Sequence, residues 1–237
     1  MIYWLLLPLP VLIAVLDTGA KGDWPNGWNA IDSSSEIQDT NGHGTQLIEE
    51  IRASSQNVNI LPIQVSRNGH DLQADPLMRG IKYASAHGAR IILVAMGMRE
   101  SSPELEKAVL SAIEAGTIVV AAAGHGLENP FRPQPLSTLT PQRLPGVIVV
   151  GEAPNRDTYR VDQNFGPELS FVVLRSKQLY SGSSFSAARA SGRIGEMLYR
   201  EPYLTSNSVM LRMSASIIPR PTSIPIERFG LGVLKTN

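Results

Sequence analysis

The sequence predicts an α/β fold with a mostly parallel sheet, and two observations support this prediction. Short apolar runs alternate with helical patterns from residue 11 onward, which is typical of consecutive βαβ units. Neither an internal repeat nor a linker-like stretch interrupts this alternation. We therefore expect residues 1–237 to form a single domain, with any ligand bound at the carboxyl ends of the strands.

Composition excludes several classes of function. Lys plus Arg and Asp plus Glu number 21 each, so no net charge favours nucleic acid or anionic lipid as a partner. The chain has no cysteine, which excludes disulfides, thiolate nucleophiles and cysteine-bound metals. A catalytic nucleophile would have to be a hydroxyl, a carboxylate or an amine.

Residues 1–16 are mostly apolar and raise the question of a signal peptide. No lysine or arginine precedes Lys21, and two prolines interrupt the run, which is unlike a secretory signal. The run is also shorter than the roughly 20 apolar residues that span a bilayer. We interpret residues 11–16 as a buried strand that leads to Asp17, and a secretory signal is the alternative.

Helical and extended patterns alternate through the next part of the chain. Residues 44–55 place apolar side chains on one helical face, and residues 58–65 form an apolar run of strand length. Residues 75–88 follow as a helix, with Asp75 as the expected N-cap and Gly88 as the stop signal. With the strand before Asp17, these segments make one βαβ unit and the helix of a second.

The best-defined helix pattern lies at residues 102–116. Ser102 is the N-cap candidate, an apolar stripe follows at helical spacing, and Gly116 ends the pattern. Apolar runs at residues 89–97 and 117–123 flank this helix, and both are predicted to be buried strands.

The remaining patterns predict a loop, a strand and a second well-defined helix. Residues 127–145 are rich in proline and indicate a surface loop, and residues 146–151 repeat the buried-strand pattern. The helix pattern runs from Ser184 to residue 202 and carries small residues on one face, which would let it pack unusually close to its neighbours. These small residues are Ala188, Ser191 or Gly192, and Gly195.

Three polar residues stand at strand ends or helix starts: Asp17, His43 and Ser184. A serine hydroxyl is a poor nucleophile unless a base removes its proton, and a histidine acts as that base when a carboxylate fixes its tautomer. Each residue alone also has an ordinary structural explanation as a turn residue or a helix cap. Together they supply one nucleophile, one base and one carboxylate.

The segments around these residues resemble the motifs of the subtilisin-like serine proteases. "AVLDTG" resembles the aspartate motif, "DTNGHGT" the histidine motif and "SGSSFSAARASG" the serine motif, in the chain order of that family. The terminal "FGLGVL" is similar to the last turn of the family's catalytic domain. The resemblance runs from Val11 to Leu234, and it implies a three-layer subtilisin-like fold with helices on both faces of a mostly parallel sheet.

The resemblance also implies a role for each motif residue. Ser184 would be the nucleophile, His43 the general base and then acid, and Asp17 the residue that orients the imidazole. The backbone N–H of Ser184, at a helix start, would bind the oxyanion of the reaction intermediate.

A histidine stands where the family usually has the asparagine that gives a second oxyanion donor. "VVAAAGHG" is similar to that segment and places His125 at the asparagine position. A neutral imidazole also carries one N–H donor. We therefore expect His125 to complete the oxyanion hole, and a structural histidine with a buried, backbone-bonded ring is the alternative.

By the same resemblance, two strand edges hold the substrate. Ala95, Met96 and Gly97 form one edge, and Ala123 and Gly124 form the other. Main-chain pairing there would bind a peptide or protein in an extended conformation without demanding a particular sequence.

Three further positions depart from the family pattern. Ser183 replaces the usual threonine, and Ala188 and Arg189 replace the usual proline and histidine. These changes concern the packing behind Ser184 rather than its identity.

No cofactor, metal or membrane span is expected. The calcium loop of many relatives has no room before residues 58–65, and the oxygen-rich residues 31–39 lack spaced carboxylates. Only 16 residues precede Asp17, too few for the folding propeptide of secreted relatives, so we expect either that the gene lacks one or that this is a processed chain. These features favour the cytoplasm, with secretion or delivery without a recognisable signal as the alternative.

The leading hypothesis is a serine endopeptidase that forms an acyl-enzyme on Ser184. A catalytically weak or inactive member that binds peptides is the first alternative, motivated by His125, Ala188 and Arg189. A peptide-cyclising transpeptidase is the second, because excluding water from the acyl-enzyme depends on features that no motif reports. Cleavage preference and oligomeric state do not follow from the sequence.

Overall fold

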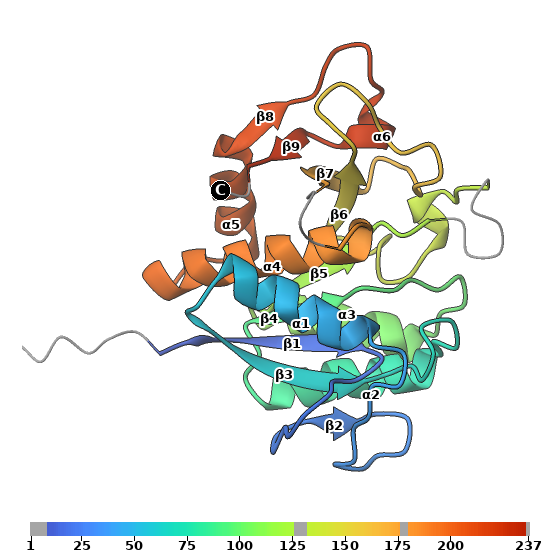
Figure 1. Cartoon of the computed structure of the whole chain (residues 1–237), viewed down its shortest axis with the longest axis vertical. Coiled ribbons are helices and arrows are strands. Elements are labelled where there is room, and N and C mark those ends of the chain that lie inside the picture. The colour runs from blue at the N-terminus through green and yellow to red at the C-terminus, as the bar shows by residue number, and fades with distance from the viewer. Residues whose placement is uncertain (1–8, 126–131, 176–179, 236–237) are drawn as a thin grey trace, which may run out of the picture.

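The central sheet is mostly parallel, as predicted. The computed structural model describes residues 9–125, 132–175 and 180–235. Its strands are β1 Val11–Asp17, β2 Trp28–Asn29, β3 Val58–Gln64, β4 Ile91–Val94, β5 Ile118–Ala122, β6 Ile148–Ala153, β7 Leu169–Leu174, β8 Ile217–Pro219 and β9 Gly232–Leu234. They form one sheet in the order β2-β3-β1-β4-β5-β6-β7-β9-β8 (Figure 1). Neighbouring strands are parallel except β8 and β9, which are antiparallel.

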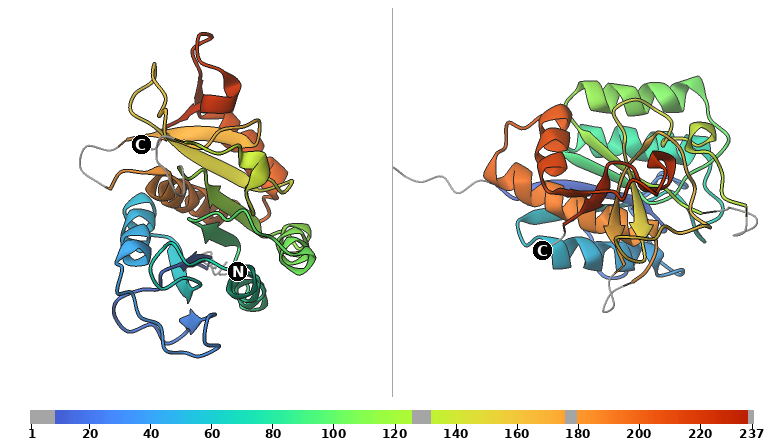
Figure 2. Two further views of the ribbon diagram at one scale, coloured as in Figure 1. Left: turned by 90° about the vertical axis from the view of Figure 1, so that its right-hand side faces the viewer. Right: turned by 90° about the horizontal axis from the view of Figure 1, so that it is seen from above.

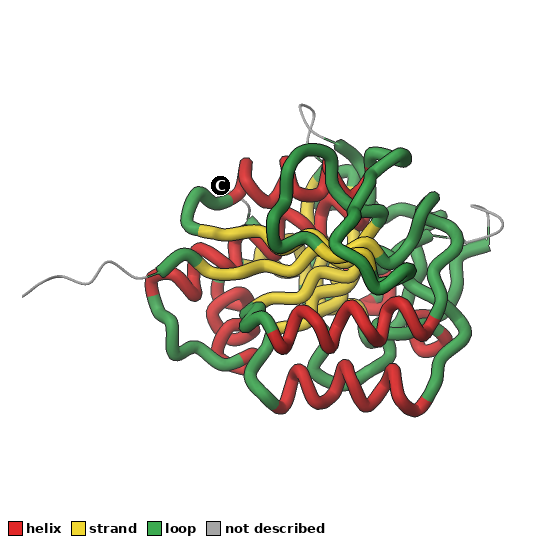
Figure 3. Tube along the Cα trace, turned by 90° about the horizontal axis from the view of Figure 1, so that it is seen from below, coloured by secondary structure: helices red, strands yellow, loops and turns green. Residues whose placement is uncertain are grey.

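Helices cover both faces of this sheet. One face carries α1 His43–Ser54, α4 Ser183–Arg200 and α5 Ser206–Ala215, and the other carries α2 Ala74–Ala86 and α3 Pro103–Glu114 (Figure 2). Side chains alternate between the two cores along β1, with Leu16 facing α2 and Val15 facing α1. Figure 3 shows the strands between two layers of helices, which confirms the predicted three-layer α/β fold.

Among the helices of the described residues, none combines the length and the apolar character that crossing a bilayer requires.

Helix α4 packs unusually close to its neighbours, as its small residues predict. A Cβ atom on Gly192 would lie 2.8 Å from the carbonyl oxygen of Ile51 on α1, and one on Gly195 would lie 2.5 Å from Val58 Cγ1 on β3. Ordinary Cβ contacts are longer than 3.0 Å. Glycine at both positions therefore allows α4 to lie against α1 and the sheet. The first turns of α1 and α4 meet where the His43 ring contacts the Phe185 ring.

The predicted N-cap of the second helix is wrong by two residues. Helix α2 begins at Ala74 with Gln73 as its N-cap, so Asp75 lies inside the first turn. Its carboxylate pairs instead with Arg79 one turn later, at 3.1 Å. Acidic side chains are favourable throughout the first turn of a helix, so Asp75 marks this region without being the cap.

The predicted loop at residues 127–145 is confirmed for the part that the structure describes, residues 132–145, but this loop is partly buried rather than confined to the surface. Gln142 donates to the carbonyl oxygens of Met96 and Ala122, at 3.0 and 2.8 Å, and so attaches this segment to the ends of β4 and β5. Prolines indicate irregular backbone, and here that backbone is packed into the domain. Its buried residues include Leu136, Leu139, Thr140 and Gln142.

Candidate active site

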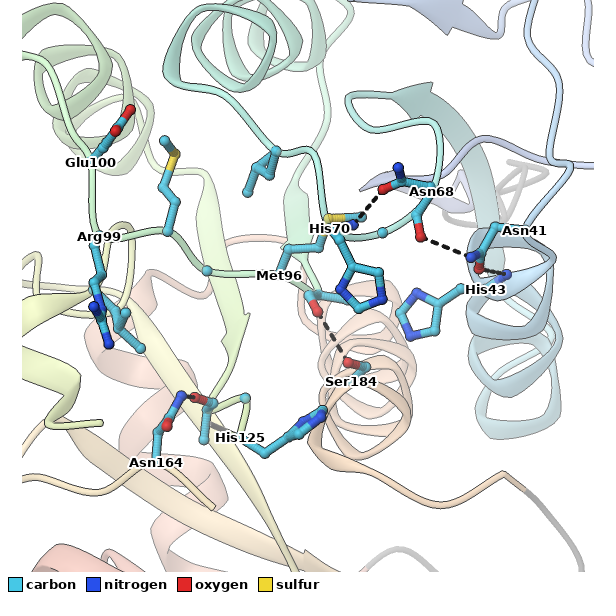
Figure 4. A pocket seen from close by; sticks show the side chains of 18 residues that line it. Asn41, His43, Asn68, His70, Met96, Arg99, Glu100, His125, Asn164 and Ser184 are labelled. Carbon is cyan, nitrogen blue, oxygen red and sulfur yellow. Dashed lines mark hydrogen bonds between the residues drawn. The ribbon is translucent and has the colours of Figure 1, made fainter. Parts of the chain in front are cut away.

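The three predicted catalytic residues reach one edge of the sheet from three elements. Asp17 is the last residue of β1, His43 is the first residue of α1, and Ser184 is the second residue of α4. Strand β1 lies between β3 and β4, so the order in which strands are added to the sheet reverses at β1. α/β sheets bind ligands at such a switch point. His43 and Ser184 line a cavity at this edge (Figure 4).

Asp17 and His43 form a hydrogen-bonded pair. His43 Nδ1 lies 2.7 Å from Asp17 Oδ1, and the Asp17 side chain is fully buried whereas that of His43 is 26% exposed. Asp17 Oδ1 also accepts the backbone N–H of Thr18 at 2.8 Å. Because an ionised carboxylate only accepts hydrogen bonds, His43 donates through Nδ1 and keeps Nε2 as an acceptor. A general base requires this tautomer.

A second carboxylate, Asp39, supports this pair. Its Oδ1 accepts from Thr18 Oγ1 at 2.8 Å and from the N–H of Gly42 at 2.7 Å. Burial raises the pKa of Asp39, but its hydrogen bonds outweigh burial and lower that pKa overall. Asp39 begins the histidine motif and was not predicted as a site residue; the turn chemistry of an aspartate before Asn41 and Gly42 is the sequence signal for its role.

The two carboxylates together affect the protonation of His43. Burial lowers the pKa of His43, but the hydrogen bond to Asp17 and the charges of Asp17 and Asp39 outweigh burial. The pKa of His43 is therefore raised above its ordinary value. Both carboxylates favour the imidazolium that forms when His43 accepts a proton.

Ser184 stands at the N-terminus of α4, where backbone N–H groups have no partner within the helix. Gly182 before it has a φ of 135°, a conformation that favours glycine. Ser184 Oγ donates to the carbonyl oxygen of Ala95 at 3.0 Å, and within the described residues no hydrogen bond joins it to His43. A rotation of the Ser184 side chain would redirect the hydroxyl, and catalytic hydrogen bonds often form only in the reacting complex.

His125 follows β5 on the other side of the cavity. Gly124 before it has a φ of 74°, and Gly126 lies outside the described residues. The His125 side chain is exposed and extends toward Ser184 (Figure 4), so its ring is not the buried ring of the structural alternative. Asp162 lies near this ring: its pKa is lowered first by the hydrogen bond from Arg160, with a smaller contribution from His125.

The cavity has a volume of about 750 Å³. Residues that the sequence analysis did not single out complete its walls, among them His70, Arg99 and Asn164. They come from loops that only the fold brings together. The predicted substrate-binding residues also line it: Ala95, Met96, Gly97, Ala123 and Gly124.

Each departure from the family pattern has a local contact that accommodates it. Ser183 Oγ accepts the N–H of Gly124 at 2.9 Å and so joins the start of α4 to the loop after β5. Ala188 is fully buried. Arg189 is 4% exposed and its guanidinium lies 3.2 Å from Glu50 Oε2. The region behind Ser184 thus contains a buried ion pair between Arg189 and Glu50.

Two of the three carboxylates in the oxygen-rich residues 31–39 have partners within the chain. Asp32 pairs with Arg67 at 2.8 Å, and Asp39 is bonded to Gly42 and Thr18. Across the described ranges, no three histidine or carboxylate side chains form a group that could hold a metal ion.

Comparison with known families and proteins matches nearly the whole chain. The model of the subtilase family matches residues 10–232. Thermitase of Thermoactinomyces vulgaris is 32% identical over 130 residues, and the major intracellular serine protease of Bacillus subtilis is 29% identical over 216 residues. The second alignment covers 78% of this chain and 67% of that protease.

The chain is shorter than some of these relatives. The thermitase alignment covers 48% of this chain and 47% of thermitase, so it spans about half of that protein. A thermostable alkaline protease of Halalkalibacterium halodurans, 26% identical, is matched over 85% of this chain and 60% of its own length.

Two solved structures share the fold. A cold adapted subtilisin-like serine proteinase has a TM-score of 0.82 at 20% identity, with 97% of this chain and 89% of that chain covered. A lanthipeptide protease has a TM-score of 0.80 at 19% identity, with 97% and 88% covered. Identities this low establish the fold alone.

Proposed function

Because the chain belongs to the subtilase family, we propose that it is a serine endopeptidase with Ser184 as nucleophile, His43 as general base and acid, and Asp17 as orienting carboxylate. One observation carries this proposal. His43 Nδ1 lies 2.7 Å from the buried carboxylate of Asp17, while the His43 ring and Ser184 line the same cavity. This arrangement supplies a base of the correct tautomer next to a hydroxyl at a helix start.

The first half of the proposed reaction forms an acyl-enzyme. The Ser184 hydroxyl leaves the Ala95 carbonyl, gives its proton to His43 Nε2 and adds its oxygen to the substrate carbonyl carbon. Asp17 stabilises the resulting imidazolium without taking its proton. His43 then gives the proton to the leaving amine as the C–N bond breaks.

The second half releases the acid product. A water molecule gives a proton to His43 as it adds to the ester carbonyl on Ser184. The ester C–O bond then breaks, and His43 returns the proton to the Ser184 oxygen. The triad is restored without a metal or a redox step.

Two groups stabilise the oxyanion that forms in each half. The backbone N–H of Ser184 lies in the first turn of α4, where the helix dipole also favours negative charge. The ring N–H of His125 is the second donor, from the opposite side of the cavity. Donors of this kind act mainly in the transition state, where the negative charge develops.

The substrate is a peptide or protein segment in an extended conformation. The backbone at residues 95–97 and at residues 123–124 lines the cavity after β4 and β5. An extended chain can pair with both edges through its main chain, which gives affinity without a fixed sequence.

The two alternatives are less consistent with the site. A protein that only binds peptides has no use for a buried aspartate that holds a histidine in one tautomer. A transpeptidase must keep water from its acyl-enzyme, but His70 and His125 in the walls of this cavity are exposed to solvent.

Labelling by a fluorophosphonate tests the proposal, because this probe reacts with activated serine hydroxyls. We expect stoichiometric labelling at Ser184 in the wild-type chain and none in Ser184→Ala. Ser191→Ala is the matched control, since Ser191 is buried on the same helix and its hydroxyl donates to the carbonyl of Ala187. Folded wild-type protein that does not react would overturn the proposal and favour the binding function.

We also propose that the protein acts in the cytoplasm. One similar protein, the major intracellular serine protease of Bacillus subtilis, supports this by its name. Fractionation of the source cells would test this, with the protein expected in the soluble fraction. Recovery of the protein from the medium of intact cells would contradict it.

A further inference from the structure

The segment that leads into the nucleophile helix is held by two buried carboxylates. We call this segment, residues 180–182, the entry segment. Glu50 on α1 is 1% exposed and Glu152 on β6 is fully buried, and neither residue lines the cavity. Burial of a carboxylate is costly unless it is paired and hydrogen-bonded, so the partners of these two residues indicate what they do.

Glu50 binds the entry segment at Tyr180. Glu50 Oε1 accepts the N–H of Tyr180 at 3.0 Å, and Glu50 Oε2 pairs with Arg189 Nη1 at 3.2 Å. The same Nη1 of Arg189 donates to the carbonyl oxygen of Tyr180 at 3.3 Å. One buried ion pair therefore fixes both polar groups of the Tyr180 backbone.

This ion pair also joins the two helices that carry the reacting groups. Glu50 lies about two turns after His43 on α1, and Arg189 lies about one and a half turns after Ser184 on α4. The Tyr180 ring stacks on Phe185 with centroids 5.1 Å apart, and Phe185 contacts the His43 ring edge-on at 5.3 Å. The entry segment thus contacts the nucleophile helix at Phe185, and the Phe185 ring links it to His43.

Glu152 binds the other end of the entry segment. Its Oε1 accepts the N–H of Gly182 at 2.7 Å, and its Oε2 accepts the hydroxyl of Ser181 at 3.1 Å. Arg160 and Arg175 neutralise it, with donors 2.9 and 3.4 Å from Oε2. Gly182 is the N-cap residue of α4 and has no side-chain cap, so a carboxylate from β6 fixes the backbone directly before the helix.

We propose that Glu50 and Glu152 are positioning residues, which hold the entry segment from two sides and thereby set the position of Ser184 relative to His43. The inference rests on the proposed function, because it gives these residues a role in aligning the same nucleophile and base. It also explains why an arginine at position 189 is compatible with a working site, since its guanidinium completes the contact to Tyr180.

The test separates positioning from stability by replacing the ion pair with apolar residues. Apolar replacement of both partners of a buried ion pair often preserves stability. The double variant Glu50→Leu/Arg189→Met should therefore melt near the wild-type temperature, although it has lost both contacts to the Tyr180 backbone. We expect it to react with the fluorophosphonate to full stoichiometry but about 100-fold more slowly, as a displacement of about 1 Å predicts.

Glu152→Gln is a second variant that keeps the test informative if the double variant does not fold. A glutamine at this position can still accept from Gly182, but it brings no charge to Arg160 and Arg175. We expect slower labelling with full stoichiometry, and lower kcat with KM unchanged on a peptide substrate. Glu152→Ala removes the acceptor as well and should react more slowly still.

Glu196→Gln is the matched control. Glu196 is also on α4 and accepts from Ser55 and Asn57 after α1, at 3.0 Å each, but it lies at the far end of the helix from the entry segment. This variant should label at the wild-type rate.

Three results would overturn the inference, and they are distinguishable. Wild-type labelling rates in the folded double variant and in Glu152→Gln would leave the proposed function intact and remove the positioning role. A wild-type labelling rate with a reduced final stoichiometry in these variants would show loss of folded protein only, and this result would also remove the positioning role. Absence of labelling in the wild-type chain would refute the proposed function, and the inference with it.

Discussion

The two halves of the cavity are held in place by different kinds of contact. In the base half, Asp17, Asp39 and His43 are linked through Thr18 and the backbone of Gly42, all within a short stretch of chain. In the nucleophile half, the entry segment is held by Glu50 and Glu152, and Glu50 is far from it in sequence. The base half is therefore specified by local motifs, whereas the nucleophile half also depends on buried charges that no motif contains.

This difference predicts how the halves respond to substitution. Changes in the base half alter proton transfer directly, because Asp17 and Asp39 act on the protonation of His43. Changes behind the nucleophile alter alignment and leave proton transfer intact.

Asp17→Asn should lower kcat by about 10⁴-fold, the largest effect expected in the base half. The amide that replaces the carboxylate can donate to His43 Nδ1 and so favours the tautomer in which Nε2 carries the proton. That tautomer cannot accept the proton of Ser184. Steady-state kinetics on a peptide substrate would measure the loss, and circular dichroism would verify the fold. Retention of activity within tenfold of wild type would show that Asp17 does not set the tautomer.

His125→Ala should lower kcat by roughly 100- to 1,000-fold with little change in KM, because an oxyanion donor acts mainly in the transition state. His125→Asn should restore part of the loss, since an amide can donate from nearly the same place. Steady-state kinetics and melting temperatures of the wild type and the two variants would decide between a catalytic and a structural role for His125. A His125→Ala protein that melts early but turns over normally would show that the residue is structural.

The pH dependence of kcat/KM should place the titration of His43 above its ordinary pKa of 6.5, because Asp17 and Asp39 raise that pKa despite burial. Activity should rise with pH through this titration, since the base must be deprotonated. The stability that His43 contributes has the opposite trend: it is fully present below pH 6.5 and is lost as pH rises through the raised pKa.

Asp39→Asn should move the midpoint of this profile to lower pH, because it removes one of the charges that raise the pKa of His43. Asp71→Asn is the control, since Asp71 is hydrogen-bonded to Ser66 and Arg67 and is not among the groups that shift His43. A midpoint at or below 6.5 in the wild-type chain would contradict the electrostatic description of the base half.

A chelator should have the smallest effect. The entry segment is held by charged side chains of the chain itself. We therefore expect the melting temperature to stay within about 2–4 °C of its original value when EDTA is added. A bound ion stabilises a fold only through its affinity for the native state. Differential scanning calorimetry with and without chelator would measure this. A large downward shift would reveal a cation that helps to hold one of the halves.

The sequence predicted the fold well because buried parallel strands are continuous apolar runs that periodicity detects. Residues 11–16 and 146–151 are examples, and both form central strands. The elements after α4 were not predicted, among them the ten-residue helix α5. β8 and β9 are only three residues long, and α6, Ile226–Phe229, is a single turn. Such short elements depend on their neighbours rather than on a pattern of their own.

The candidate site was predicted only where its residues stand in motifs. Asp17, His43 and Ser184 belong to recognisable segments, and the fold brings His43 and Ser184 to one cavity. Glu50 resembles any glutamate of an amphipathic helix, and Glu152 resembles a polar residue at a strand end. Their burial depends on Arg189, which is far from Glu50 in sequence, and on Arg160 in the loop after β6, so periodicity has no means of detecting it.

Gly192 and Gly195 extend the requirements of the site well beyond the atoms that react. Any side chain at Gly192 would push against the backbone of α1, and any at Gly195 against β3. Both would displace α4 as a rigid body and carry Ser184 with it. In a saturation library selected for fluorophosphonate reactivity, these interior positions should tolerate as few replacements as the cavity walls do. The positions that are sensitive to mutation would then extend along α4 into the core as well as around the cavity.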